Sequence, residues 1–172
     1  MNSLVKITKK NRQSIMKKLD KIDYKIIDIL QKDGRVTNQE LARQVDLAPS
    51  SCLLRLRHLE ENGVISGYHA RVNLHSVCRF VTCMAGVNLK NHTHQEFIAF
   101  QEVVASIPEI VEYYTVSGEC DFILKIICRD MSAYLEINDK LISSSSYSAI
   151  INTYVVMEEN KSFSSVDLDT LI

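Results

Sequence analysis

The sequence has no apolar run of transmembrane length and no apolar core near its start that would suit a secretory signal. A helix needs about 20 apolar residues to span a bilayer, so we expect a cytoplasmic protein without a membrane anchor. The five cysteines show none of the close paired spacing that zinc ligands need, and their odd number is typical of reduced thiols. We therefore expect no disulfide framework and no metal site.

Patterns that predict catalysis are missing as well. The sequence shows no nucleophile–base pair, no metal-ligand cluster and no phosphate-binding loop, and Glu158 and Glu159 fit surface charges better than catalytic carboxylates. We expect that the protein is not an enzyme and uses no cofactor. Cys120 lies in a predicted turn and could be reactive, but an incidental cysteine explains it better than a redox sensor.

The net charge is only −1, but it is unevenly distributed. Residues 1–75 carry a balance of +6 and residues 76–172 a balance of −7. A basic half beside an acidic half predicts nucleic acid as the partner of one end only. Residues 1–18 hold six Lys and Arg and no acidic residue. They form either a basic arm that follows a DNA backbone or a solvated, partly helical tail.

Residues 19–73 show three short helical patterns separated by tight turns. Asp20 can cap the first helix, and Asp33-Gly34 ends it. Thr37 followed three residues later by Glu40 is the capping-box pattern of a second helix. Pro49 suits the first position of a third helix, which Gly63 ends. Three helices in this arrangement predict a helix-turn-helix.

The third predicted helix has two faces. Cys52, Leu53, Leu56 and Leu59 are expected to point inward. The polar face fits DNA, because an arginine can pair with a guanine edge and hydroxyls at a helix start can hold phosphates. Alone, such a face fits an ordinary solvated helix better, but the preceding capped helix and turn favour DNA recognition. The residues expected to contact DNA are Thr37, Asn38, Pro49, Ser50, Ser51, Leu54, Arg55, Arg57 and His58.

A small hairpin is expected between residues 64 and 72, where it would form the wing of a winged helix-turn-helix. Val64-Ile65, Gly67-Tyr68 and the run from His69 to Val72 carry the pattern. His69 and Arg71 can either contact phosphate or lie on a plain surface.

The second half reads as strand, helix, strand, strand, helix, strand. This order is that of the ferredoxin-like split βαβ fold, so the predicted class is α+β. The expected elements are strands at 80–89, 110–116, 122–128 and 150–157 and helices at 94–106 and from Asp130 through Tyr134, Leu135, Ile137 and Leu141.

Both faces of the predicted sheet carry apolar side chains, although two helices can cover only one of them. Val81, Cys83 and Ala85 share one face of the first strand, and Met84 lies on the other. An uncovered apolar sheet face predicts a partner, and we expect dimerisation through it. Two-fold symmetry would then present two recognition helices to a near-palindromic site in double-stranded DNA.

The predicted turn from Val116 to Asp121 could bind a free amino acid. A glycine turn exposes backbone N–H groups to a carboxylate, and Asp121 could accept hydrogen bonds from an ammonium group. From spacing alone, an ordinary hairpin turn explains these residues better.

Five runs in this order resemble the Lrp/AsnC family of regulators. They are LDKIDYKIIDILQKDGRVTNQELARQV, PSSCLLRLRHLEENGVISGYHARVN, VSGECDFILKI, DMSAY and TYVVMEE, and they extend over residues 19–161. The resemblance implies an N-terminal winged helix-turn-helix and a C-terminal domain that dimerises, assembles further to a tetramer or octamer, and binds a small amino acid at the subunit interface. The effector residues that it implies are Tyr114, Val116, Ser117, Gly118, Asp121 and Thr153.

The chain departs from this family's pattern at several positions. Asp46 and Ala48 stand where glycine and serine are usual, and Ala48 loses a capping hydroxyl worth about 1 kcal/mol. Leu54 and His58 replace usual arginines, so the DNA target should differ. The run from Ser143 to Tyr147 replaces a segment near the effector pocket and leaves the ligand open.

We therefore expect a basic extension (1–18), a winged helix-turn-helix (19–73), a linker (74–79), a ferredoxin-like domain for effector binding and oligomerisation (80–161) and a tail (162–172). The predicted function is sequence-specific transcriptional regulation modulated by a small amino acid. The alternative is a DNA-organising protein of the same fold that responds to no effector.

Overall fold

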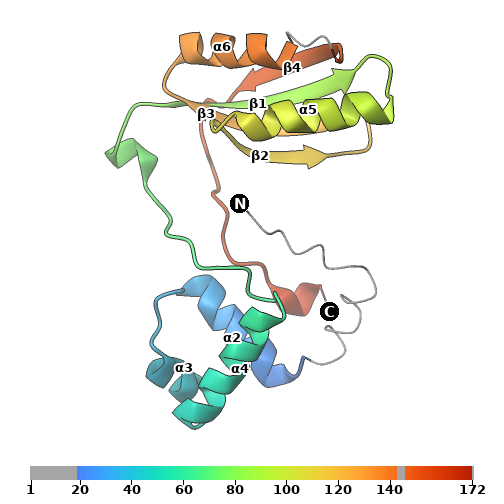
Figure 1. Ribbon diagram of the computed structural model, residues 1–172. Coiled ribbons are helices and arrows are strands. Elements are labelled where there is room, and N and C mark those ends of the chain that lie inside the picture. Colours follow the sequence, from blue (N-terminus) through green and yellow to red (C-terminus); the bar gives the residue numbers. More distant parts are fainter. Residues whose placement is uncertain (1–18, 143–145, 172) are drawn as a thin grey trace. The chain divides into compact units, whose positions relative to one another are not determined.

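The computed structural model describes residues 19–142 and 146–171 (Figure 1). The chain divides into two compact units. The first combines residues 19–71 with residues 161–171, and the second extends from residue 72 to residue 160. The basic extension at 1–18 and most of the serine run, residues 143–145, lie outside the described residues.

The first unit contains the three predicted helices α2 (Lys21–Lys32), α3 (Asn38–Gln44) and α4 (Pro49–Glu61). Asp20 caps α2 in a complete capping box with Asp23, and Gly63 follows α4 with a positive φ of 68°. These local signals confirm the predicted helix boundaries. The helices enclose one apolar core, formed by Ile26, Leu41, Ala42, Val45, Cys52 and Leu59.

Two expectations for these helices were wrong in detail. Thr37 accepts a hydrogen bond from the Glu40 N–H at 3.2 Å, but the Glu40 carboxylate binds Arg43 and Gln44 instead of completing a capping box. A nearby guanidinium is a stronger partner for a carboxylate than a backbone amide. Leu53 is 36% exposed and does not point inward, whereas Cys52 and Leu59 are buried and Leu56 packs against the core.

The expected wing hairpin forms no strand pair. Residues 62–80 contain no strand, and only the short 3₁₀ helix η1 (Leu74–Ser76) interrupts their irregular course. Val64 and Ile65 both bond back to the carbonyl of Leu59, at 2.9 and 3.1 Å. The N–H groups of Val64 and Ile65 therefore bond to the last turn of α4 and are not available to pair with a second strand.

The second unit is the predicted ferredoxin-like sheet with two helices. Its strands pair in the order β2-β3-β1-β4, all antiparallel, and α5 and α6 lie over the same face of the sheet (Figure 1). The elements are β1 (Val81–Leu89), α5 (His94–Ser106), β2 (Ile110–Thr115), β3 (Phe122–Cys128), α6 (Met131–Ile142) and β4 (Ala149–Val155).

Alternate residues of the central strands are buried beneath the helices. On β1, Cys83, Ala85 and Val87 are fully buried, and they pair with the buried residues of β3. Phe100 of α5 contacts the ring of Phe122, with ring centroids 4.9 Å apart. On α6, Tyr134, Ile137 and Leu141 are buried against the sheet, whereas Leu135 is 59% exposed.

The other face of the sheet is not covered by any described element of this unit. Met84 of β1 lies between Lys125 of β3 and Tyr154 of β4 in the strand register, and Tyr154 is 68% exposed. This face carries the apolar side chains that were predicted, together with the charged Lys125.

Candidate DNA interface and effector turn

The outer face of α4 presents the side chains that the helix pattern predicted. Ser50 and Ser51 lie exposed in its first turn, Leu54 is 68% exposed, and Arg57 and His58 are exposed further along. Within the described parts of the chain, no side chain bonds to those of Arg57 or His58. This face therefore carries free hydrogen-bonding groups around one exposed apolar side chain.

Arg55 has a different environment from the one that the sequence predicted. Its guanidinium donates to the carboxylates of Asp20 at 2.7 Å and Asp23 at 2.8 Å, and its side chain is only one-third exposed. The hydrogen bond to Asp23 contributes most and that to Asp20 next, and both raise the pKa of the Arg55 guanidinium. Arg55 therefore fastens α4 to the start of α2 within the chain, and its assignment as a DNA-contacting residue stays a prediction.

The pair also affects the capping residue of α2. The backbone N–H of Asp23 and then the guanidinium of Arg55 lower the pKa of Asp20. Asp20 also accepts from the N–H of Ile22 at 2.9 Å. One carboxylate thus caps α2 and holds α4 of the same unit.

Thr37 and Asn38 lie at the start of α3 and have structural roles. Thr37 is the N-cap. The Asn38 amide donates to the carbonyl of Pro49 at 2.9 Å, which joins the first turns of α3 and α4. Its carbonyl oxygen is buried and has no hydrogen-bond partner in the described part of the chain. Asn38 is therefore a positioning residue for the start of the recognition helix.

A shallow cavity of about 460 Å³ lies where α3 and α4 begin, lined among others by Thr37, Arg43 and Pro49. Arg43 donates to both oxygens of Glu40, at 3.0 and 2.7 Å. This contact lowers the pKa of Glu40 to about 2. The acidic charge at this end of the helix pair is therefore neutralised by a neighbour on the same helix.

Four of the predicted effector residues lie in the connection between β2 and β3. The Val116 N–H donates to the carbonyl of Asp121 at 3.0 Å and closes the turn around Ser117. Gly118 has a φ of 130°, and no atom lies within 4 Å of the position that a Cβ would take. Glycine is required by the backbone conformation there, and the space beside it is open.

The Asp121 carboxylate already has two partners. One oxygen accepts from the Leu89 N–H at 2.8 Å, and the other lies 3.2 Å from Nδ1 of His92. Asp121 thereby connects the turn to the end of β1. His92 was missed at the sequence level, and its positive φ of 51° is a feature that only the structure reveals.

Tyr114 and Thr153 do not join these residues within one chain. Tyr114 is on β2 and pairs with Ile123, whereas Thr153 is on β4, and these strands form opposite edges of the sheet. The Tyr114 hydroxyl donates to Glu112 at 2.7 Å, and the Thr153 hydroxyl bonds that of Tyr134 on α6. A single subunit therefore assembles only the turn portion of the predicted effector set.

Among the described residues, no group of three or more His, Cys, Asp or Glu side chains is arranged to hold a metal ion. None of the described helices is long and apolar enough to cross a membrane.

Family models match both units. A winged helix-turn-helix DNA-binding model matches residues 19–66, and the Lrp/AsnC ligand binding domain model matches residues 82–166. The chain is 39% identical to the leucine-responsive regulatory protein of Escherichia coli strain K12 over 145 residues, which cover 84% of this chain and 88% of that protein. The protein of the same name from Klebsiella pneumoniae shows the same identity and coverage.

Solved structures agree with this assignment. A transcriptional regulator from Neisseria meningitidis, crystallised as a complex with L-methionine, superposes with a TM-score of 0.82 at 32% identity and covers 90% of this chain and 99% of that one. An AsnC family transcriptional regulator from Agrobacterium tumefaciens gives a TM-score of 0.80 at 30% identity, with 90% and 100% covered. The chain belongs to the Lrp/AsnC family of transcriptional regulators, with a winged helix-turn-helix DNA-binding domain and a ligand-binding domain of the family type.

Proposed function

We propose that this regulator reads DNA with the outer face of α4 and that an amino acid bound beside the 116–121 turn modulates its binding. The observation that carries the first part is the unpaired, exposed set on α4. Arg57 and His58 can donate to base edges or phosphates, and Leu54 can contact a thymine methyl group. Ser50 and Ser51 place hydroxyls and backbone amides at the positive end of the helix, where a phosphate binds.

The proposed effector is an α-amino acid, because its two charged groups suit the two sides of this turn. Gly118 leaves open space beside backbone amides that can bind the carboxylate. The Asp121 oxygen that now faces His92 can accept from the ammonium group. The complex of the Neisseria meningitidis regulator with L-methionine supports this ligand class.

A dimer is proposed to complete the site, with a tetramer or octamer as the larger assembly. Tyr114 and Thr153 lie on opposite edges of one sheet, so they can line one pocket only if different subunits supply them. The uncovered sheet face around Met84 and Tyr154 offers the dimer interface. Because a bacterial or archaeal DNA regulator acts on the nucleoid, we also propose a cytoplasmic location.

A thermal-shift screen of the full-length protein against the free amino acids tests the effector. A ligand at 100 times its Kd should stabilise the protein by about 2.7 kcal/mol. Calorimetry with the best ligand then compares three variants. Asp121→Asn should weaken binding about ten- to a hundredfold, since a charge-assisted hydrogen bond is worth roughly 1.5–3 kcal/mol. His92→Ala should preserve or tighten binding because it frees the shared oxygen.

His94→Ala is the matched control, because His94 is an exposed histidine two positions further along and has no side-chain hydrogen bond in the described part of the chain. Equal affinity of wild type and Asp121→Asn would remove Asp121 from the site. A screen without any ligand, together with intact DNA binding, would favour the effector-independent DNA-organising protein.

A further inference from the structure

The segment after the ligand-binding domain returns to the DNA-binding unit. Residues 161–171 group with residues 19–71, and they contain the short 3₁₀ helix η2 (Leu168–Thr170). A cavity of about 380 Å³ is lined by apolar residues of α2, by residues 64–68 and by Val166 and Leu168 of this segment. The segment therefore lies along the residues that were expected to form the wing hairpin.

Gln31 of α2 holds the segment by its backbone. The Gln31 amide donates to the carbonyl of Val166 at 3.1 Å, and the Val166 N–H donates to the Gln31 side-chain oxygen at 2.9 Å. The N–H and the carbonyl of Val166 are thus both hydrogen-bonded, as they would be by a neighbouring β-strand. The two residues are 135 positions apart in the sequence.

Arg71 supplies a second anchor from the other side. Its guanidinium donates to the carbonyl of Phe163 at 2.9 Å. Arg71 lies within the irregular stretch of residues 62–80, which forms no strand pair. The segment is therefore fixed both to α2 and to the residues that follow the recognition helix.

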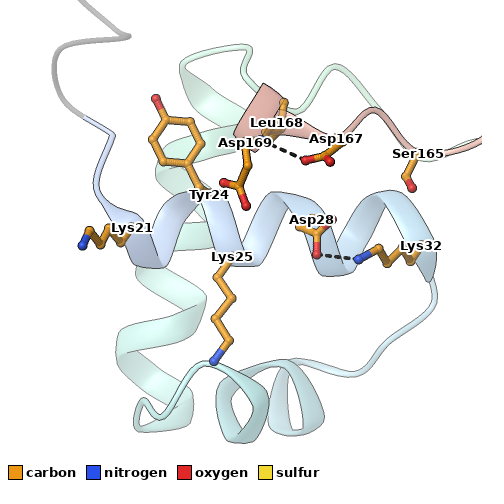
Figure 2. Close-up of a pocket in the computed structure, with 9 residues that line it drawn as sticks. All are labelled: Lys21, Tyr24, Lys25, Asp28, Lys32, Ser165, Asp167, Leu168 and Asp169. Atoms are coloured by element: carbon orange, nitrogen blue, oxygen red, sulfur yellow. Dashed lines mark hydrogen bonds and ion pairs between the residues drawn. The ribbon is translucent and has the colours of Figure 1, made fainter. Parts of the chain in front are cut away.

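The end of the segment folds over one side of α2 (Figure 2). Asp167 caps η2 by accepting from the Asp169 N–H at 3.1 Å. Leu168 and Asp169 line a mixed-charge cavity of about 660 Å³ with Lys21, Tyr24 and other α2 residues. Lys25 points away from the segment toward the helices below (Figure 2), where it lies 4.0 Å from Asp46. Lysines of α2 and aspartates of the segment line this cavity together, so the acidic end of the segment lies against a partly basic side of α2.

We propose that residues 161–171 are a structural part of the DNA-binding unit, in which they substitute for the missing partner strand of the wing. Docking of the segment holds residues 64–68 beside α2 and fixes Arg71, while the Tyr68 hydroxyl donates to Glu60 of the recognition helix at 2.9 Å. The segment is also the continuation of β4, separated from Val155 only by residues 156–160. The DNA-binding unit is therefore joined to the ligand-binding domain by a second covalent connection.

Full-length Gln31→Leu tests the proposal. Gln31 is exposed on α2, so leucine preserves the helix and removes only the two bonds to Val166. Amide exchange of Val166, followed by NMR, should become at least about tenfold faster. Gln101→Leu is the matched control, since Gln101 lies on helix α5 of the other unit and has no side-chain bond in the described part of the chain.

DNA binding provides the second readout, and it depends on the proposed DNA interface. Gln31→Leu and a chain that ends at Asn160 should both bind DNA about three- to tenfold more weakly than wild type and Gln101→Leu. Unchanged Val166 exchange in Gln31→Leu would overturn the docking. If Gln31→Leu speeds Val166 exchange but binds DNA as tightly as wild type or more tightly, the segment does not support the wing. If the wild-type protein itself binds no DNA, the proposed DNA interface is refuted instead.

Discussion

At the residue scale, Arg55 and Arg57 are neighbours on α4 with opposite expected roles. Arg55→Ala removes the partner of Asp23, whose side chain is only 10% exposed. Because it leaves a mostly buried carboxylate without a cationic partner, with only the Asp20 N–H as donor, this change should destabilise the DNA-binding unit by about 2 kcal/mol. Arg57→Ala should change stability by less than about 0.5 kcal/mol and weaken specific DNA binding by about 1–3 kcal/mol. Denaturant titration and mobility-shift assays separate the two effects. The opposite pattern would restore Arg55 as the base reader.

The Asp20 carboxylate should make the stability of the DNA-binding unit depend on acid pH. Its pKa is lowered from 3.8 in the folded state, chiefly by the Asp23 N–H and then by Arg55. A carboxylate with a lowered folded pKa contributes stability above its unfolded pKa, and this contribution is lost as the pH falls through the folded pKa. Thermal melts below about pH 4 should therefore fall less steeply for Asp20→Asn than for wild type. Glu61→Gln, on the exposed end of α4, is the control, and identical slopes for wild type and Asp20→Asn would contradict the expectation.

At the scale of elements, the turn between α3 and α4 carries two unfavourable residues. Asp46 adopts a positive φ of 57°, which favours glycine, and this explains why glycine is usual at the position. Ala48 is the N-cap of α4 and offers no side-chain hydrogen bond. Both departures weaken the connection that places the recognition helix, and Asn38 offsets part of the loss through its bond to Pro49.

Ala48→Ser should therefore stabilise the protein by about 1 kcal/mol. Ala48 already has the extended backbone of an N-cap, with φ −66° and ψ 144°, so a serine hydroxyl could accept from the free N–H groups of the first turn. The midpoint of urea unfolding measures the gain, and Ala70→Ser in the irregular stretch after α4 provides the control. An unchanged midpoint for Ala48→Ser would show that the first turn of α4 needs no further acceptor.

Local elements were predictable because their signals are local. The capping residues, Pro49 and Gly63 act within a few positions of the helix ends, and strand alternation predicted the buried face of β1. The contacts that changed the site are not local. Arg55 bonds residues 32 and 35 positions away, and Gln31 bonds one 135 positions away. Likewise, the separation of Tyr114 from Thr153 follows from the strand order, which their positions in the sequence do not encode.

At the scale of the whole molecule, the excess positive charge lies outside the described part of the DNA-binding unit. Residues 19–71 have equal numbers of acidic and basic side chains, so the +6 balance of the N-terminal half comes from residues 1–18. The folded DNA-binding unit therefore gains little from net attraction to DNA. If the proposed dimer forms, we expect its affinity to come from specific contacts, from the basic extension and from the pairing of two units.

The uncovered sheet face should provide that pairing. Tyr154 is 68% exposed and lies beside Met84 in the strand register, so an aspartate there would place a charge in the proposed interface. Tyr154→Asp should shift the protein toward a folded monomer in sedimentation experiments and weaken binding to a two-half-site DNA more than binding to a single half-site. Leu135→Asp is the matched control, because Leu135 is 59% exposed on α6, on the opposite side of the sheet. A Tyr154→Asp protein that sediments like wild type would exclude this face as the dimer interface, and equal dissociation of both variants would show that the effect is not specific to the sheet.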